Sequence, residues 1–70
     1  MNRDEWIEEF AGELGIGRPT PDEIDALLEL AAIAAHASER TAAPVACWLA
    51  GLSGMSLERL KEVAEGIGSG

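Results

Sequence analysis

The stretch TPDEIDALLELAAIAAHASER, residues 20–40, contains the clearest helix start in the sequence and predicts its longest helix. Thr20 stands where an N-cap is expected, the proline after it fits the first helical position, and Glu23 completes the spacing of a capping box. We expect this helix to run to Glu39 or Arg40, which gives a length of roughly 30 Å at 1.5 Å per residue.

Apolar residues occur on two opposite sides of this helix. At 100° per residue, one stripe consists of Ile24, Leu28, Ala31 and Ala35, and the other of Ala26, Leu30, Ile33 and Ala37. A helix that is apolar on two faces is normally enclosed. It is therefore either the central helix of its own bundle or a helix that packs one stripe on another chain. On the second interpretation, Leu30 and Ile33 are the candidate interface for self-association or a protein partner.

Three shorter helices are predicted around the long one. The first begins after Asn2, which has capping-box spacing to Glu5, and ends at Gly15. The third begins near Thr41, and the fourth begins after Ser56. The apolar stripe of the third helix is Val45, Trp48, Leu49 and Leu52. The inward residues expected for the fourth are Leu57, Leu60, Val63, Ala64 and Ile67.

These elements predict an all-α fold, a compact four-helix bundle or array with a long central second helix. Residues 1–70 form a single domain, and we expect its C-terminal residues 66–70 to be frayed. A single core of this size rarely supplies more than roughly 3–5 kcal/mol of stability. Little interior is left for a preorganised active site, so we expect no catalytic activity and no catalytic residues.

The charge of the chain excludes several classes of partner. Thirteen acidic residues against five basic ones give a net charge of −8, and the five bases are scattered. Nucleic acids and anionic membrane surfaces both require clustered basic residues, so neither is an expected partner. The acidic N-terminus does not resemble a signal peptide, and no apolar run reaches the roughly 20 residues of a membrane span. We expect a cytoplasmic protein.

The corner after the long helix holds the scarce chemical side chains. His36 and Arg40 are four residues apart, which predicts that they are neighbours on one helix face. Together with Thr41 and the N-terminus of the third helix they could hold an anion, and Trp48 adds an aromatic side chain typical of binding surfaces. These four residues are the candidate binding surface. The alternative is a structural role, in which basic residues stabilise the helix end and Trp48 packs in the core.

Cys47 is the only cysteine, so the chain cannot form an internal disulfide. A nucleophilic pair with His36 is conceivable, but a cysteine between alanine and tryptophan more often packs as a small apolar residue. One cysteine and one histidine do not supply the ligands of a zinc site. We expect no metal and no cofactor.

The order of features resembles a known family. The segments DEWIEEFAGELGI, PDEIDALLELAAIAAH and AAPVACWLAGL are similar to a small all-helical bacterial domain of unknown function. That domain is found alone or fused to nucleotidyltransferases that make molybdopterin guanine dinucleotide. The resemblance implies an accessory role in molybdenum-cofactor biosynthesis. It supplies no catalytic residues.

Two functions are consistent with these observations. The first is a protein-interaction module of molybdenum-cofactor biosynthesis, whose partner is a nucleotidyltransferase of that route or a second copy of the chain. The second is a small-ligand domain that binds an anionic cofactor or nucleotide at the corner of His36 and Arg40. The first predicts a specific partner, or self-association through Leu30 and Ile33. The second predicts ligand-induced shifts at His36 and Arg40 in an NMR titration.

Overall fold

The computed structural model describes residues 1–67 and contains four helices and no strand within that range. They are α1 (Arg3–Leu14), α2 (Pro21–Ala37), α3 (Ala42–Ser53) and α4 (Leu57–Gly66). The predicted all-α fold with four helices is confirmed. Gly66 is the last residue of α4, and positions 68–70 of the expected frayed end lie outside the described residues.

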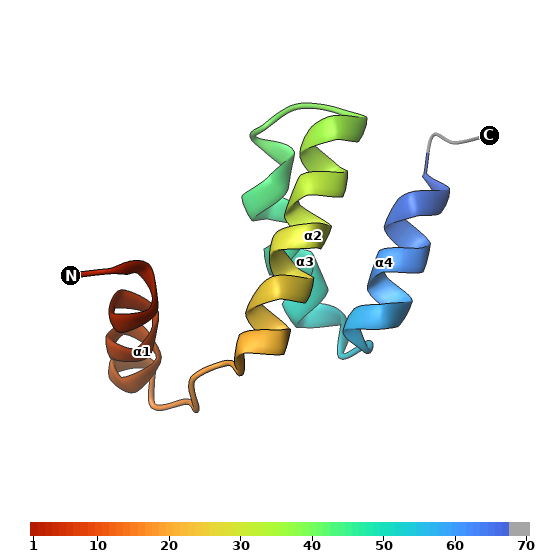
Figure 1. Ribbon diagram of the computed structural model, residues 1–70. Helices are drawn as coiled ribbons and strands as arrows, with labels where there is room; N and C mark the ends of the chain where they lie inside the picture. Colours follow the sequence, from red (N-terminus) through yellow and green to blue (C-terminus); the bar gives the residue numbers. More distant parts are fainter. Residues whose placement is uncertain (68–70) are drawn as a thin grey trace.

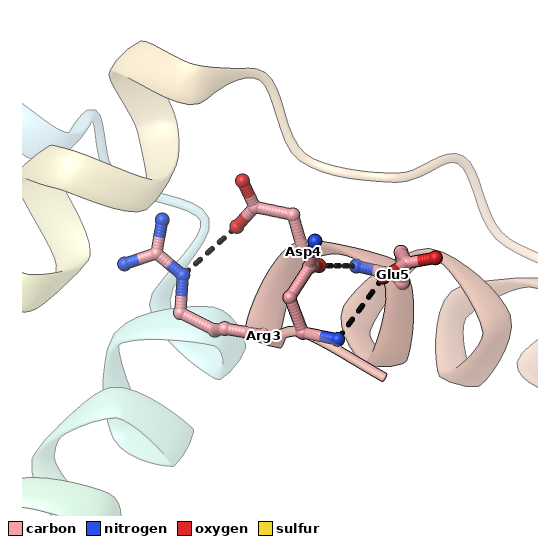
Figure 2. A network of polar contacts seen from close by, with 4 residues as sticks. Arg3, Asp4 and Glu5 are labelled. Atoms are coloured by element: carbon pink, nitrogen blue, oxygen red, sulfur yellow. Dashed lines mark hydrogen bonds and ion pairs between the residues drawn. The ribbon is translucent and has the colours of Figure 1, made fainter.

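The helix starts form as the sequence predicts. In the capping box of α1, the Glu5 backbone N–H donates to Asn2 Oδ1 at 2.8 Å, and the Asn2 N–H donates to Glu5 Oε1 at 3.0 Å (Figure 2). The same reciprocal pair joins Thr20 and Glu23 at the start of α2. Ser56 caps α4 by accepting from a backbone N–H. Each bond satisfies an N–H that the helix itself leaves without an acceptor.

Two glycines end helices in the left-handed conformation. Gly15 follows α1 with φ of 72°, and Gly54 follows α3 with φ of 69°. A side chain is strained at such φ values, so glycine is the residue that lets the chain reverse here. The two reversals set the directions in which the chain leaves α1 and α3.

The long helix α2 is central, as predicted. It packs against α3 on one side and α4 on another, and α1 lies apart near its N-terminal end (Figure 1). The segment 15–20 connects α1 to α2, and an ion pair of 2.9 Å between Arg18 and Glu8 ties this segment back to α1. The described chain therefore consists of a three-helix unit with one helix beside it.

The buried core is very small. Within residues 1–67, only Ala11, Leu30 and Ala50 are buried. The radius of gyration is 12.9 Å, well below the roughly 26 Å of an unfolded chain of this length but above the roughly 11 Å of a closely packed domain. Most of the large apolar side chains therefore remain at the surface of the single chain.

The structure also changes the expected orientation of α4. Leu57, Leu60 and Ala64 are half-buried, but Val63 and Ile67 are exposed, against the prediction that all five face inward. Because α4 packs mainly on α2, only the residues on that side of the helix lose contact with water.

Candidate interaction surface

The corner between α2 and α3 is not the shared helix face that the sequence predicted. His36 lies in the last turn of α2, but the helix ends at Ala37, short of the expected Glu39 or Arg40. The Ser38 backbone N–H and its hydroxyl both donate to the carbonyl oxygen of Ala34, at 3.2 and 2.9 Å. With φ of −140° and ψ of −95°, Ser38 takes the chain out of the helix. Arg40 therefore lies in the connecting turn.

The start of α3 also lacks free donors for an anion. The Ala42 and Ala43 N–H groups donate to the carbonyl oxygens of Glu39 and Arg40, at 3.0 and 3.1 Å, and the next residue is Pro44. Thr41 precedes the helix as predicted but makes no capping bond, and its backbone angles, φ −68° and ψ −15°, are helical and not the extended ones of an N-cap. Its hydroxyl lies 3.5 Å from the Glu39 carboxylate. An anion at this helix end would meet backbone groups that already have partners.

The two basic side chains of this corner are exposed and make no polar contact within residues 1–67. Neither the imidazole of His36 nor the guanidinium of Arg40 forms a hydrogen bond or an ion pair there. The cavities described here between α2, α3 and α4 are lined by other residues. Among the four predicted surface residues, Trp48 is the large apolar one, and it is exposed.

The two residues of the predicted interface, Leu30 and Ile33, are covered to different extents within the chain. Leu30 is only 5% exposed, and Ile33 is half-buried. Both side chains line a cavity of about 260 Å³ together with Ala46 of α3 and Ala64 of α4. The prediction is therefore wrong for Leu30, which α3 and α4 of the same chain cover, whereas Ile33 stays only half-buried. Leu28, on the opposite stripe, is half exposed.

Cys47 packs toward α2 and not toward the corner. It is half-buried, and its Sγ lies 4.0 Å from the carbonyl oxygen of Leu27. No contact between Cys47 and His36 occurs in the described part of the chain. The same residues include no cluster of three side chains that could hold a metal ion. Cys47 and His36 therefore do not form the conceivable nucleophile–base pair in the described residues.

The apolar stripe of α3 lies on the outer face of the helix and is not packed against the rest of the chain. Its four large apolar residues are each more than half exposed, and Trp48 reaches 67%. We call Val45, Trp48, Leu49 and Leu52 the α3 stripe. The small residues on the other side of the helix face α2 instead, and Ala50 among them is buried. Small side chains let α3 lie close to α2, which leaves the bulky ones outside.

A second apolar face lies on α1. Trp6, Phe10 and Leu14 are each at least half exposed, and we call them the α1 stripe. The Trp6 and Phe10 rings stack with centroids 5.0 Å apart and planes inclined by 29°. Glu9 and Glu13 border the rings and line a shallow hollow of about 200 Å³ with them. The stacked pair forms a rigid aromatic platform with carboxylates along one edge.

The two stripes differ in charge. Helix α1 carries Arg3 and five acidic residues, and α3 contains no charged residue. The α3 stripe is therefore wholly apolar, and the α1 stripe has an acidic border.

The one basic residue of α1 is paired with an acidic neighbour. The Arg3 Nε donates to Asp4 Oδ1 at 2.8 Å, and this hydrogen bond raises the pKa of the guanidinium (Figure 2).

One ion pair connects α2 and α4. Lys61 donates to the Glu29 carboxylate at 2.6 Å, and this hydrogen bond raises the pKa of the Lys61 ammonium. The Glu29 side chain is mostly exposed and that of Lys61 is partly exposed, so the pair adds little to the stability of the fold. The helices in the described residues are too short or too polar to cross a bilayer.

The sequence pattern identified the residues of the α3 stripe but did not show that they are exposed. The signal was present in α3, where small residues occupy the face opposite Val45 and Leu49. A helix with one small and one bulky face can pack either side inward, so the pattern alone does not decide between them.

Comparison with known proteins identifies the family of the chain. No curated protein and no solved structure matches the chain. One family model matches residues 1–68, almost the full length, and its description is a domain of unknown function, DUF6457. This agrees with the resemblance to an all-helical domain of unknown function. The four-helix chain, with its two exposed apolar stripes, belongs to the DUF6457 family.

Proposed function

We propose that this protein is a protein-interaction module without catalysis of its own, and that it contacts its partners through the α1 and α3 stripes. The observation that carries the proposal is the exposure of seven large apolar side chains on two helices of one 70-residue chain. Exposed apolar side chains occur singly on most proteins, but a continuous group that includes aromatic rings is typical of an interaction surface.

The biological setting of the proposal comes from the resemblance of the sequence. The similar bacterial domains occur alone or fused to nucleotidyltransferases that make molybdopterin guanine dinucleotide. We therefore propose that the chain is an accessory of molybdenum-cofactor biosynthesis, whose role is to hold proteins together. The small core is consistent with such a role.

The test is direct binding between the purified chain and the nucleotidyltransferase that makes molybdopterin guanine dinucleotide in the same organism. We expect a complex in isothermal titration calorimetry, and we expect Trp48→Lys to weaken it about 30-fold. This is the effect of losing a tryptophan hot spot worth about 2 kcal/mol.

The matched control for this test is Ile67→Lys. Ile67 is as exposed as Trp48 but lies at the end of α4, outside both stripes. This variant should bind like the wild type. Absence of any complex with the wild-type chain at about 100 μM would refute the proposed role in this route. Equal loss in both variants would refute the stripes as the contact surface.

A further inference from the structure

The single chain exposes more surface than a closely packed protein of its mass. Its accessible area is 5381 Å², whereas a folded monomer of 7.4 kDa is expected to expose about 4,200 Å². The excess is about 1,200 Å² per chain, and a standard interface covers about 800 Å² on each partner. The chain therefore has enough uncovered surface for one full protein interface.

The stripes are similar in length, and both consist of large apolar side chains. Trp6 to Leu14 spans about 12 Å of α1, and Val45 to Leu52 spans about 10 Å of α3. Within one chain neither stripe covers the other, because both remain at least half exposed. A helix from another molecule is needed to cover each of them.

We propose that the partner is a second copy of this chain, with α1 of each copy packed on the α3 stripe of the other. This inference rests on the proposed function, because it concerns the same two stripes. A second copy and the nucleotidyltransferase would therefore compete for them, and binding of the nucleotidyltransferase would displace the second copy. A twofold axis repeats the contact, so each stripe is covered once and none is left over. The very small core supports this pairing, because small domains without disulfides or metals gain the missing burial by association.

Two other pairings of the copies, α1 on α1 and α3 on α3, are less favourable. Packing α1 on α1 of the second copy would bring together the carboxylates of Glu9 and Glu13 from both chains. Packing α3 on α3 would leave both α1 stripes in water. Packing α1 on α3 places the acidic helix beside one that has no charge to repel it.

The test uses two variants that each destroy one half of the contact. Trp6→Glu disables the α1 stripe, and Trp48→Lys disables the α3 stripe. In sedimentation equilibrium from about 1 to about 500 μM, we expect the wild-type chain to reach twice its mass of 7.4 kDa. Each variant alone should stay at the monomer mass, with its dimer weakened by a factor of about 100 or more.

Mixing the two variants distinguishes the pairings. One chain then contributes an intact α3 stripe and the other an intact α1 stripe, so one of the two contacts is restored. We expect the mixture to form heterodimers at concentrations where each variant alone is monomeric. Circular dichroism of each variant verifies that the helices remain folded, and Ile67→Lys should dimerise like the wild type.

Other outcomes would overturn the inference. Dimers of Trp6→Glu alone, or a mixture that stays monomeric, would exclude packing of α1 on α3 of a second copy. A wild-type chain that is monomeric at every concentration but binds the nucleotidyltransferase through Trp48 would overturn the second-copy inference and leave the proposed function standing. An intact dimer that does not bind the nucleotidyltransferase would support the second-copy inference and refute the proposed role in molybdenum-cofactor biosynthesis.

Discussion

Leu30→Ala should remove most of the stability of the chain. Leu30 is the one large apolar residue that is buried within residues 1–67, and it lies where α2 meets α3 and α4. Truncating a buried leucine costs about 2–5 kcal/mol. A single core of this size supplies roughly 3–5 kcal/mol, so the loss is comparable to the whole.

The measurement for this prediction is urea unfolding followed by circular dichroism, with Leu28→Ala as the matched control. Leu28 is the same residue type on the same helix, but it is half exposed on the opposite stripe. Its truncation should cost less than about 1 kcal/mol. Equal losses in the two variants would show that α3 and α4 do not cover the Leu30 side of α2.

The thermal stability of the wild-type chain should depend on its concentration. If each copy covers the stripes of the other, unfolding also separates two chains, and dilution favours the unfolded state by mass action. A hundredfold dilution changes the free energy by about 2.7 kcal/mol, which lowers Tm by about 9 °C for the 140 residues of a dimer. Differential scanning calorimetry at two concentrations measures this shift.

The control for the thermal measurement is the Trp48→Lys variant. It should have a lower Tm than the wild type at high concentration, and its Tm should not change on dilution. A wild-type Tm that stays constant over the same hundredfold range would mean that folding and association are independent.

The sequence predicted local features of the fold more reliably than the packing of its faces. The capping boxes of Asn2 and Thr20 need only residues three positions apart, so their spacing identified two helix starts. The end of α2 was missed because it depends on Ser38, whose bonds to Ala34 stop the helix before Arg40. Serine is also common within helices, so its presence does not mark an end.

The candidate surface was predicted only in part, for a reason that concerns packing. A helical wheel finds an apolar stripe but does not say whether the same chain covers it. On α2, the pattern left open whether the Leu30 stripe packs within the chain or on a partner, and α3 and α4 bury Leu30 within the chain. On α3, the alanine side of the helix packs on α2, and Trp48 on the other side stays exposed. These outcomes depend on how the helices dock, which spacing within one helix does not determine.

The most direct test of the interaction surface is the tryptophan emission of the chain as its concentration rises. Trp6→Phe leaves Trp48 as the single reporter on α3, and Trp48→Phe leaves Trp6 on α1. Both indoles are more than half exposed in one chain, so dilute samples should emit like tryptophan in water. If the two stripes are contact surfaces, both emission maxima should shift to shorter wavelength as the chain associates. Emission that remains at the solvent-exposed wavelength at every concentration, and with the nucleotidyltransferase added, would contradict the account.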